Sequence, residues 1–270
     1  MSNITARTNI CMVIGDPIEH SLSPHIHNAG YEALGIDDQF VYVASRVEIS
    51  DIEDFTKGIR AMNIRGVSCT IPHKVAVMPH LDEVEDIAKK IGAVNTIVNE
   101  NGRLIGYNTD WLGVLIPLES VTNLENKTVA LIGAGGAARA VAYAVTCRGA
   151  KLTVYNRTFE KGKELAKEFG GIAYRMDNIE NVKDADILIN TTPVGLHDKN
   201  ETPVSKKYIT EKHIVFDAVY GDETQLIKDA KGKGAQTIDG IEMLLNQGFA
   251  QFKLFTGFDA PAAAMRKVLK

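Results

Sequence analysis

Residues 129–139 read Val-Ala-Leu-Ile-Gly-Ala-Gly-Gly-Ala-Ala-Arg, and they lie close to the middle of the chain. A short apolar run that predicts a buried strand is followed by a glycine turn and by the start of an alanine-rich helix. This is the context of a dinucleotide-binding fingerprint. Gly133 allows the tight turn, Gly135 lets the backbone approach a pyrophosphate, and Ala138 is small enough for the helix to pack on the strand. Because the helix N-terminus also offers free N–H groups and a positive dipole end to phosphates, the stretch predicts a dinucleotide-binding unit.

Apolar stretches alternate with segments of helical spacing on both sides of this turn. The expected strands are residues 10–14, 40–44, 66–71, 129–132, 152–155, 186–190 and 214–217. The expected helices are residues 24–34, 49–62, 84–91, 110–118, the segment from the glycine turn to about residue 147, and 159–169. Residues 94–99 and 104–107 predict a hairpin that turns at Asn101-Gly102. The alternation predicts an α/β architecture with mostly parallel sheets, and the first half of the chain is long enough for a separate substrate domain.

Composition excludes several classes of protein. With 270 residues, of which 45% are hydrophobic and 24% charged, the chain can bury one large core or two ordinary ones. A net charge of -4 argues against a nucleic-acid-binding surface. No run approaches the roughly 18 apolar residues of a membrane span. Three widely separated cysteines predict neither disulfides nor a metal site but buried thiols in a reducing, cytoplasmic compartment; they are Cys11, Cys69 and Cys147.

The residues after the second strand of the dinucleotide unit indicate which nucleotide binds. A site for NAD usually carries an acidic residue about 20 residues beyond the glycines, where it binds the ribose 2′-hydroxyl. This chain has Asn156-Arg157-Thr158 there instead, with Lys161 one turn further on. Asn156 carries no charge that would repel a 2′-phosphate, whereas Arg157 and Lys161 can pair with it. NADP is therefore the expected cofactor, and the alternative is a solvated basic loop.

The first half of the chain carries polar clusters where strands are expected to end. These clusters are residues 15–28, 66–74, 92–96 and 106–110. Together they describe a pocket rich in Ser, Thr, Asn and Asp with one Lys, which suits a small polyhydroxylated acid. Lys74 and Asp110 suit proton transfer beside hydride transfer to a ketone. The alternatives are that Lys74 is a surface lysine and that Asp110 caps the helix that follows it.

The N-terminal loops also carry histidines, which raise the question of a metal site. They are His20, His25, His27 and His73. No cysteine or carboxylate cluster completes a set of four ligands, so no metal is expected. We expect these histidines to cap helices and to hydrogen-bond within their loops. Ser23 is expected to cap the helix that starts at Pro24.

The motifs resemble, in order and almost from end to end, those of the shikimate dehydrogenase family, which includes shikimate/quinate dehydrogenases. They are G-x-P-I-x-H-S-x-S-P-x-x-H-N at residues 15–28, T-I-P-x-K at 70–74, G-A-V-N-T at 92–96, G-x-N-T-D at 106–110, G-A-G-G-A-A-R at 133–139, N-R-T at 156–158, D-x-x-Y at 217–220 and G-x-x-M-L-x-x-Q at 240–247. The resemblance implies an α/β fold with a substrate-binding and catalytic domain over residues 1–109, a Rossmann-type NADP-binding domain over 110–239, and a C-terminal helical segment, 240–270, that packs back on the first domain.

The resemblance also implies an activity, the NADPH-dependent, reversible reduction of 3-dehydroshikimate to shikimate in aromatic amino-acid and chorismate biosynthesis. Lys74 would be the acid/base and Asp110 its partner. The substrate-binding residues would be Ser21, Ser23, Thr70, Lys74, Asn95, Asp110, Tyr220 and Gln247. The cofactor-binding residues would be Gly133, Ala134, Gly135, Gly136, Ala137, Asn156, Arg157, Thr158, Lys161, Thr191, Val219, Gly240 and Met243. The protein would be a monomer or a homodimer, without nucleic-acid or membrane partners.

The chain departs from the family pattern at three places. Ser68-Cys69 stands where many members have Asn-Val, Gly221-Asp222 stands where Asn-Pro is usual, and Lys161 stands where Arg is common. Lysine keeps the charge but loses bidentate geometry, so the preference for NADP could be less strict. Two alternatives stay open: a quinate/shikimate dehydrogenase that uses NAD or either cofactor, and a non-catalytic nucleotide-binding module that kept the fold.

Overall fold

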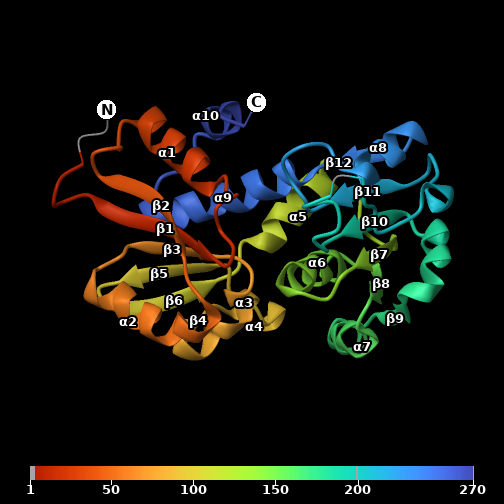
Figure 1. Cartoon of the computed structure of the whole chain (residues 1–270), viewed down its shortest axis with the longest axis horizontal. Helices are drawn as coiled ribbons and strands as arrows, with labels where there is room; N and C mark the ends of the chain where they lie inside the picture. The colour runs from red at the N-terminus through yellow and green to blue at the C-terminus, as the bar shows by residue number, and fades with distance from the viewer. Residues whose placement is uncertain (1–3, 199, 270) are drawn as a thin grey trace. The chain divides into compact units, whose positions relative to one another are not determined.

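The structure, a computed structural model, describes residues 4–198 and 200–269. The chain divides into two compact units. The first unit is Met1–Thr109 with Gln247–Lys270, and the second is Asp110–Asn246. The chain returns to the first unit within one helix, α9 (Gly240–Thr256), and Figure 1 shows the order of the elements. The sequence analysis placed this second boundary at residue 240, where the same helix begins.

The first unit is built on a six-stranded sheet with the order β2-β1-β3-β5-β6-β4. Its strands are β1 (Asn9–Gly15), β2 (Phe40–Arg46), β3 (Gly66–Cys69), β4 (Glu83–Val84), β5 (Thr96–Glu100) and β6 (Arg103–Tyr107). β1 is parallel to β2 and β3, whereas β5 is antiparallel to β3 and β6. The predicted hairpin is confirmed, because Asn101 and Gly102 join β5 to β6 with φ angles of 55° and 92°. These left-handed values are what a tight two-residue hairpin turn requires.

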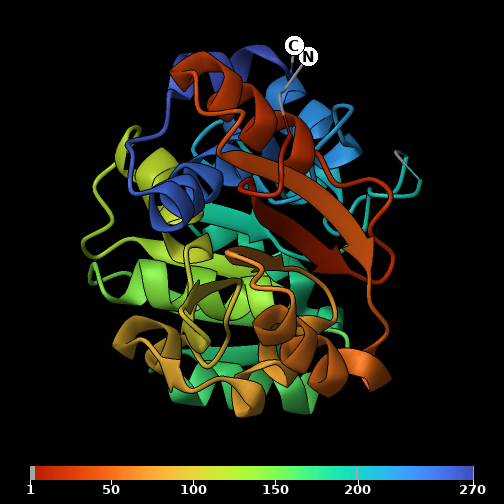
Figure 2. The same ribbon diagram turned by 90° about the vertical axis from the view of Figure 1, so that its left-hand side faces the viewer.

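Helices cover both faces of this sheet, as Figure 2 shows. They are α1 (Ser23–Leu34), α2 (Ile52–Ala61), α3 (His73–Ala76), α4 (Asp86–Ile91), the C-terminal part of α9, and α10 (Ala262–Lys267). On one face, Met12 and Ile14 of β1 pack with Ile59 of α2. The other face is covered by aromatic rings, and the ring centroids of Tyr31 in α1 and Phe252 in α9 are 5.2 Å apart. The chain's last helices are therefore part of the core of the first unit.

The second unit is built on a six-stranded, wholly parallel sheet with the order β12-β11-β10-β7-β8-β9. Its strands are β7 (Thr128–Ile132), β8 (Lys151–Asn156), β9 (Ile172–Arg175), β10 (Ile187–Asn190), β11 (Ile214–Asp217) and β12 (Gln236–Ile238). Its helices are α5 (Asp110–Glu119), α6 (Gly136–Thr146), α7 (Phe159–Glu168), α8 (Gln225–Gly232) and the start of α9. In chain order this is the 3-2-1-4-5-6 arrangement of the Rossmann fold. The strand order reverses between β7 and β10, which is where such sheets bind their ligands.

The expectation of mostly parallel sheets is confirmed. Among the described strands β5 alone runs antiparallel to its neighbours, because the short hairpin connection forces β5 and β6 to run in opposite directions. The strands β4, β9 and β12 were not expected. They have two to four residues each, and β9 is largely exposed, so they carry no apolar pattern that could reveal them.

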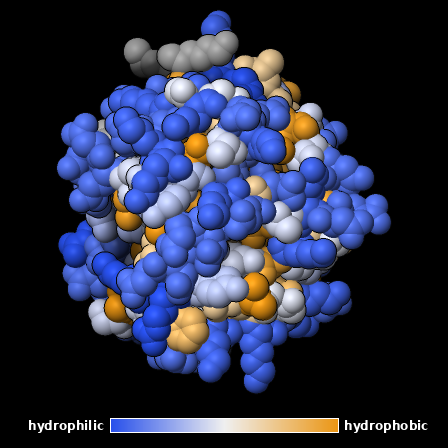
Figure 3. Space-filling model, turned by 90° about the vertical axis from the view of Figure 1, so that its right-hand side faces the viewer, coloured by the Kyte–Doolittle hydropathy of each residue, from blue (hydrophilic) through white to orange (hydrophobic). Residues whose placement is uncertain are grey.

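The side of the molecule that Figure 3 shows is mostly hydrophilic, and its hydrophobic residues are scattered rather than gathered in one patch. Among the described residues, no helix is both long and apolar enough to cross a bilayer.

Candidate functional site

Most of the residues expected to bind substrate lie in loops at one edge of the first unit's sheet, the end at which β1 and β3 finish and β5 begins. β1 and β3 are parallel neighbours, so the loops that leave them start at the same edge, and the antiparallel β5 begins there. Ser21 and Ser23 follow β1, Thr70 and Lys74 follow β3, and Asn95 directly precedes β5. Their convergence is therefore a consequence of the sheet topology.

Measured contacts join these loops. The N–H of Val94 donates to the carbonyl oxygen of Lys74 at 2.7 Å, so the loop before β5 is fastened to α3. Gln247 enters the same region from α9, and its Oε1 lies 3.5 Å from Nδ2 of Asn95. Lys74 is half-buried, whereas Asn95 and Gln247 are buried. The first unit thus brings the backbone of Lys74 and the amides of Asn95 and Gln247 to the same edge of the sheet.

The role expected for Ser23 in capping α1 is wrong. Ser23 is the first residue of α1, and the N-cap position belongs to Leu22, whose side chain makes no capping bond. Pro24 lies in the first turn, where a missing N–H costs nothing. Instead, the N–H of Ser23 donates to Oγ of Ser21 at 3.3 Å, so the two hydroxyls are placed by one tight turn.

Asn95 connects this edge to the end of the first unit. Its Oδ1 accepts a hydrogen bond from the N–H of Thr109 at 2.7 Å, and its Nδ2 donates to Oγ1 of Thr109 at 2.9 Å. Thr109 is the last residue of this segment of the first unit, and Asp110 follows as the first residue of α5. Asn95 therefore fixes the backbone from which the buried Asp110 projects.

The expectation that the histidines cap helices or hydrogen-bond within their loops is wrong for His73 and His27. His73 hydrogen-bonds through Nε2, at 2.8 Å, to the carbonyl oxygen of Val47, which belongs to a different segment of the chain. His27, however, belongs to the core: its ring stacks on Tyr42 with centroids 4.2 Å apart, and neither ring nitrogen has a hydrogen-bond partner among the described residues. No group of three possible metal ligands occurs in the described part of the chain.

The buried ring of His27 predicts an acid-sensitive fold. Burial lowers its pKa from 6.5 to about 3, and the Gln251 amide offsets this in part. Between these two pH values the unfolded chain binds a proton that the folded chain does not, so stability is complete above the unfolded pKa and falls as the pH drops. Each pH unit in this window costs about 1.4 kcal/mol.

We therefore expect the free energy of unfolding to fall by roughly 2 kcal/mol through His27 between pH 7 and pH 5. Urea denaturation at both pH values measures it. His27→Phe should lose less stability over this range than the wild type, whereas the exposed His25→Gln should behave like the wild type. Equal losses for the wild type and His27→Phe would show that other groups cause the acid sensitivity.

The cysteines do not supply a nucleophile. Burial raises the pKa of Cys11 and of Cys69 to about 12, so both thiols are protonated at neutral pH. The positive charge of Lys74 opposes this shift of the Cys69 pKa in part. All three cysteines are unpaired, but the expectation that all are buried is wrong, because Cys147 is exposed at the end of α6.

The glycine turn of the second unit has the geometry that a pyrophosphate needs. Gly133 has a φ angle of 112°, and a Cβ there would lie 2.5 Å from Oγ1 of Thr191. Gly135 is exposed, and a Cβ there would meet nothing within 4 Å, so its backbone is open to a ligand. α6 begins at Gly136, while Ala138 is fully buried against the strand. Thr191 follows β10, so turn and threonine meet where the strand order reverses.

The loop after β8 carries the residues expected to select the nucleotide. Nδ2 of Asn156 donates to the carbonyl oxygen of Thr158 at 2.8 Å, which holds the loop in a tight turn. Arg157, Thr158 and Lys161 are exposed. Neither basic side chain forms an ion pair with any residue that the structure describes, so both are available to an anion.

A buried carboxylate shapes the last part of the predicted cofactor site. Asp217 at the end of β11 accepts hydrogen bonds from Nδ2 of Asn190 at 2.9 Å and from Oγ1 of Thr224 at 2.6 Å. The loop that it holds leads to Val219, whose carbonyl oxygen would lie 2.5 Å from a Cβ on Gly240. The start of α9 therefore requires glycine because the backbone of Val219 lies too close for a Cβ on residue 240.

A small cavity lies beside this loop. Its volume is about 110 Å³, and it is lined by Tyr220, Thr224, Asp239 and Ile241, among others. Burial raises the pKa of the Tyr220 phenol above its ordinary value, so Tyr220 is a neutral hydrogen-bonding group at neutral pH. Met243, one turn further along α9, is buried in the core of the second unit.

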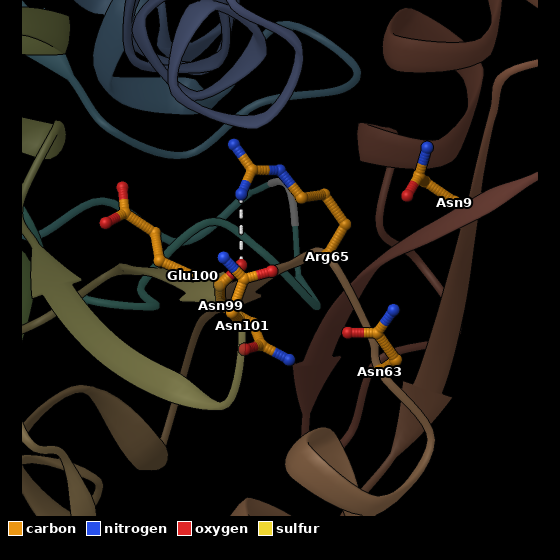
Figure 4. A pocket seen from close by; sticks show the side chains of 6 residues that line it. All are labelled: Asn9, Asn63, Arg65, Asn99, Glu100 and Asn101. Atoms are coloured by element: carbon orange, nitrogen blue, oxygen red, sulfur yellow. Dashed lines mark hydrogen bonds between the residues drawn. The ribbon is translucent and has the colours of Figure 1, made fainter.

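A larger polar cavity of about 400 Å³ lies at the opposite edge of the first unit's sheet (Figure 4). It is lined by Asn9, Asn63, Arg65, Asn99, Glu100 and Asn101. The Arg65 guanidinium donates to the carbonyl oxygens of Asn99 at 3.0 Å and of Phe255 at 2.9 Å. Arg65 therefore holds the end of α9. The other described residues that line the cavity, apart from Glu100, are asparagines, so the cavity offers Glu100 no second acid or base.

Sequence reasoning missed two buried residues, Thr96 and Gln251, that hydrogen-bond to Asn95. Thr96 and Gln251 are almost fully buried, and Nε2 of Gln251 donates to Oγ1 of Thr96 at 2.9 Å. Gln251 is four residues after Gln247, which places both amides on the same face of α9. This spacing is the signal that could have revealed it.

Comparisons with known proteins agree with this geometry. The family model described as the shikimate dehydrogenase substrate binding domain matches residues 13–97. The model for shikimate / quinate 5-dehydrogenase matches residues 117–217, and the model for the shikimate 5'-dehydrogenase C-terminal domain matches residues 240–270. Together these matches cover most of both units.

Individual relatives match over nearly the full length. The chain is 43% identical to shikimate dehydrogenase (NADP(+)) of Carboxydothermus hydrogenoformans, with 98% of each chain covered. Its fold is similar to the crystal structure of shikimate dehydrogenase from Aquifex aeolicus, with a TM-score of 0.93, 39% identity and 99% of each chain covered. It is also similar to the Thermus thermophilus enzyme in complex with NADP(H) and shikimate, with a TM-score of 0.90, 36% identity, and 97% and 98% of the two chains covered. With the polar edge of its first unit and the nucleotide turn of its second, the chain belongs to the shikimate dehydrogenase family.

Proposed function

We propose that this chain catalyses the NADPH-dependent, reversible reduction of 3-dehydroshikimate to shikimate, a step in the biosynthesis of aromatic amino acids. The observation that carries the proposal is the edge of the first unit, where Lys74 is fastened to the loop of Asn95, and where Asn95 meets Gln247. These groups, with the hydroxyls of Ser21, Ser23 and Thr70, match a substrate that has several hydroxyls, a carboxylate and a ketone.

The second unit fits the dinucleotide. The open backbone at Gly135, the start of α6 and the buried Ala138 would accommodate the pyrophosphate, with Ala134, Gly136 and Ala137 beside it. Arg157, Thr158 and Lys161 would bind the 2′-phosphate of NADP. Thr191, Val219, Gly240 and Met243 complete the proposed cofactor-binding set. When bound, the cofactor supplies the hydride.

Lys74 is the proposed acid/base. As the ketone is reduced, negative charge develops on its oxygen, and the Lys74 ammonium would donate the proton that forms the product hydroxyl. In the reverse direction the neutral amine would accept that proton. Asp110 is the proposed carboxylate partner, and Asn95 fixes the backbone that leads to it through Thr109. Tyr220 is proposed as a further substrate contact. A cytoplasmic location fits the three unpaired cysteines.

Steady-state kinetics with shikimate and quinate, each with NADP and with NAD, test the proposal. The expected result is the largest kcat/KM for shikimate with NADP. Arg157 in the loop after β8 and Lys161 in the first turn of α7 are exposed and form no ion pair with a described residue, so both can bind the 2′-phosphate. Preference for quinate, or equal use of NAD, would identify the chain as a quinate/shikimate dehydrogenase. Binding of NADP without turnover of either substrate would identify a non-catalytic nucleotide-binding module.

A further inference from the structure

We propose that Gln251 and Thr96 are positioning residues for the substrate site, because they fix which way the amide groups of Asn95 and Gln247 point. The inference deepens the proposed function and rests on it, since it takes Asn95 and Gln247 as substrate-binding residues. Neither Gln251 nor Thr96 is expected to touch substrate. Both lie behind Asn95, and their exposed fractions are 1% and 0%.

The orientation of the Gln251 amide is determined by its neighbours. One terminal atom lies 3.3 Å from the carbonyl oxygen of Asn95, which can only accept a hydrogen bond, so this atom is the nitrogen Nε2. Nε2 also donates to Oγ1 of Thr96 at 2.9 Å. The other terminal atom, Oε1, then accepts from the hydroxyl of Ser68 at 2.8 Å. Every polar atom of the Gln251 side chain has a partner in one orientation only.

The next link is Thr96. The Thr96 hydroxyl oxygen accepts a hydrogen bond from Gln251. The same hydroxyl donates its one proton to Oδ1 of Asn95 at 2.8 Å. The N–H of Thr109, which can only donate, reaches the same Oδ1 at 2.7 Å. Two donors therefore hold the oxygen of the Asn95 amide, and its Nδ2 must face away from them.

This orientation is passed on to Gln247. Nδ2 of Asn95 faces Oε1 of Gln247 at 3.5 Å. A flipped Gln247 would bring two NH₂ groups together, which is unfavourable, so Gln247 is held with its oxygen toward Asn95. The orientation of the Gln247 amide is thus set by Asn95 and, through it, by Thr96 and Gln251.

The far end of this chain of donors is anchored in the core. The Tyr42 hydroxyl donates to Oγ of Ser68 at 2.6 Å, and burial raises the pKa of Tyr42 well above its ordinary value, so the phenol keeps its proton. Every hydroxyl from Tyr42 to Thr96 then donates in the same direction, toward Asn95. Ser68 is the position where this chain departs from the Asn of many family members, and Gln251 reaches it from α9.

Kinetic measurements on variants of the full-length protein test the proposal. Thr96→Val and Gln251→Met remove the hydrogen bonds and keep the approximate shape, whereas Thr96→Ser keeps the hydroxyl. Thr56→Val is the matched control, because Thr56 is also buried in the first unit and its hydroxyl donates only to a helix carbonyl, that of Glu53 at 2.7 Å. KM for shikimate, KM for NADP, kcat and the near-UV circular dichroism are measured for each variant.

We expect Thr96→Val and Gln251→Met to raise KM for shikimate by about ten-fold, the effect of one lost hydrogen bond in the binding site, with KM for NADP unchanged. Thr96→Ser should restore a KM within about two-fold of the wild type, and Thr56→Val should not change it. An unchanged KM for shikimate in folded Thr96→Val would overturn the proposal even if Gln251→Met fails to fold. A lower kcat at constant KM would mean that both residues only stabilise the fold. A wild type that does not turn over shikimate would overturn the proposed function first, and this inference with it.

Discussion

Replacing Lys74 with alanine lowers kcat for shikimate oxidation by roughly 10²-fold or more, because the proton on the substrate hydroxyl then has no positioned acceptor. KM for NADP should stay within about two-fold of the wild type, since Lys74 belongs to the first unit and the nucleotide turn to the second. The measurement is steady-state kinetics with saturating shikimate and NADP in turn.

Lys74→Arg separates proton transfer from charge. Arginine keeps the positive charge but does not release its proton at any accessible pH, so the variant should be nearly as slow as Lys74→Ala. Lys90→Ala, which removes an exposed lysine of the same unit, should keep wild-type rates. If Lys74→Arg retains most of kcat, the role of Lys74 is electrostatic binding and the acid/base assignment fails.

Replacing Arg157 with alanine raises KM for NADP by about one to two orders of magnitude, because a charge-assisted hydrogen bond is worth roughly 1.5–3 kcal/mol. KM for NAD should change little, since NAD has no 2′-phosphate. The side chain is exposed and makes no ion pair with a described residue, so its removal should leave the stability of the unit unchanged.

Lys163→Ala is the control for this prediction, because Lys163 is an exposed cation in α7, the helix that follows the loop of Arg157, but was not assigned to the nucleotide site. It should leave KM for both nucleotides unchanged. Equal weakening of NADP and NAD by Arg157→Ala would show that the guanidinium contacts the adenine or supports the fold, and that the 2′-phosphate is bound elsewhere.

Features that depend on a few consecutive residues could be predicted from the sequence. The strand, turn and helix around Gly133 form as expected, because β-branched residues, glycine and alanine impose their preferences locally. The hairpin at Asn101-Gly102 follows from the left-handed angles that these two residues accept. The edge that carries Ser21, Thr70 and Asn95 follows from strand direction.

Features that depend on packing between distant segments could not be predicted in this way. His27 looks like a loop histidine, yet aromatic rings from α1, β2 and α9 enclose it. Gly66 has an ordinary position in a strand, yet a Cβ there would lie 2.2 Å from the ring of Phe255. Neither requirement can be recognised until α9 is packed on the sheet.

The same division holds for the candidate site. The motifs of the chain are sufficient to identify the family, the nucleotide turn and the residue types that meet substrate, because these are properties of short segments. The orientation of the Asn95 amide is different, since it depends on Thr109, and through Thr96 on Gln251, which is 155 residues away from Thr96 in the chain. Hydrogen-bond direction in a buried cluster depends on all of its donors and acceptors at once, so it exists only after the distant segments have come together.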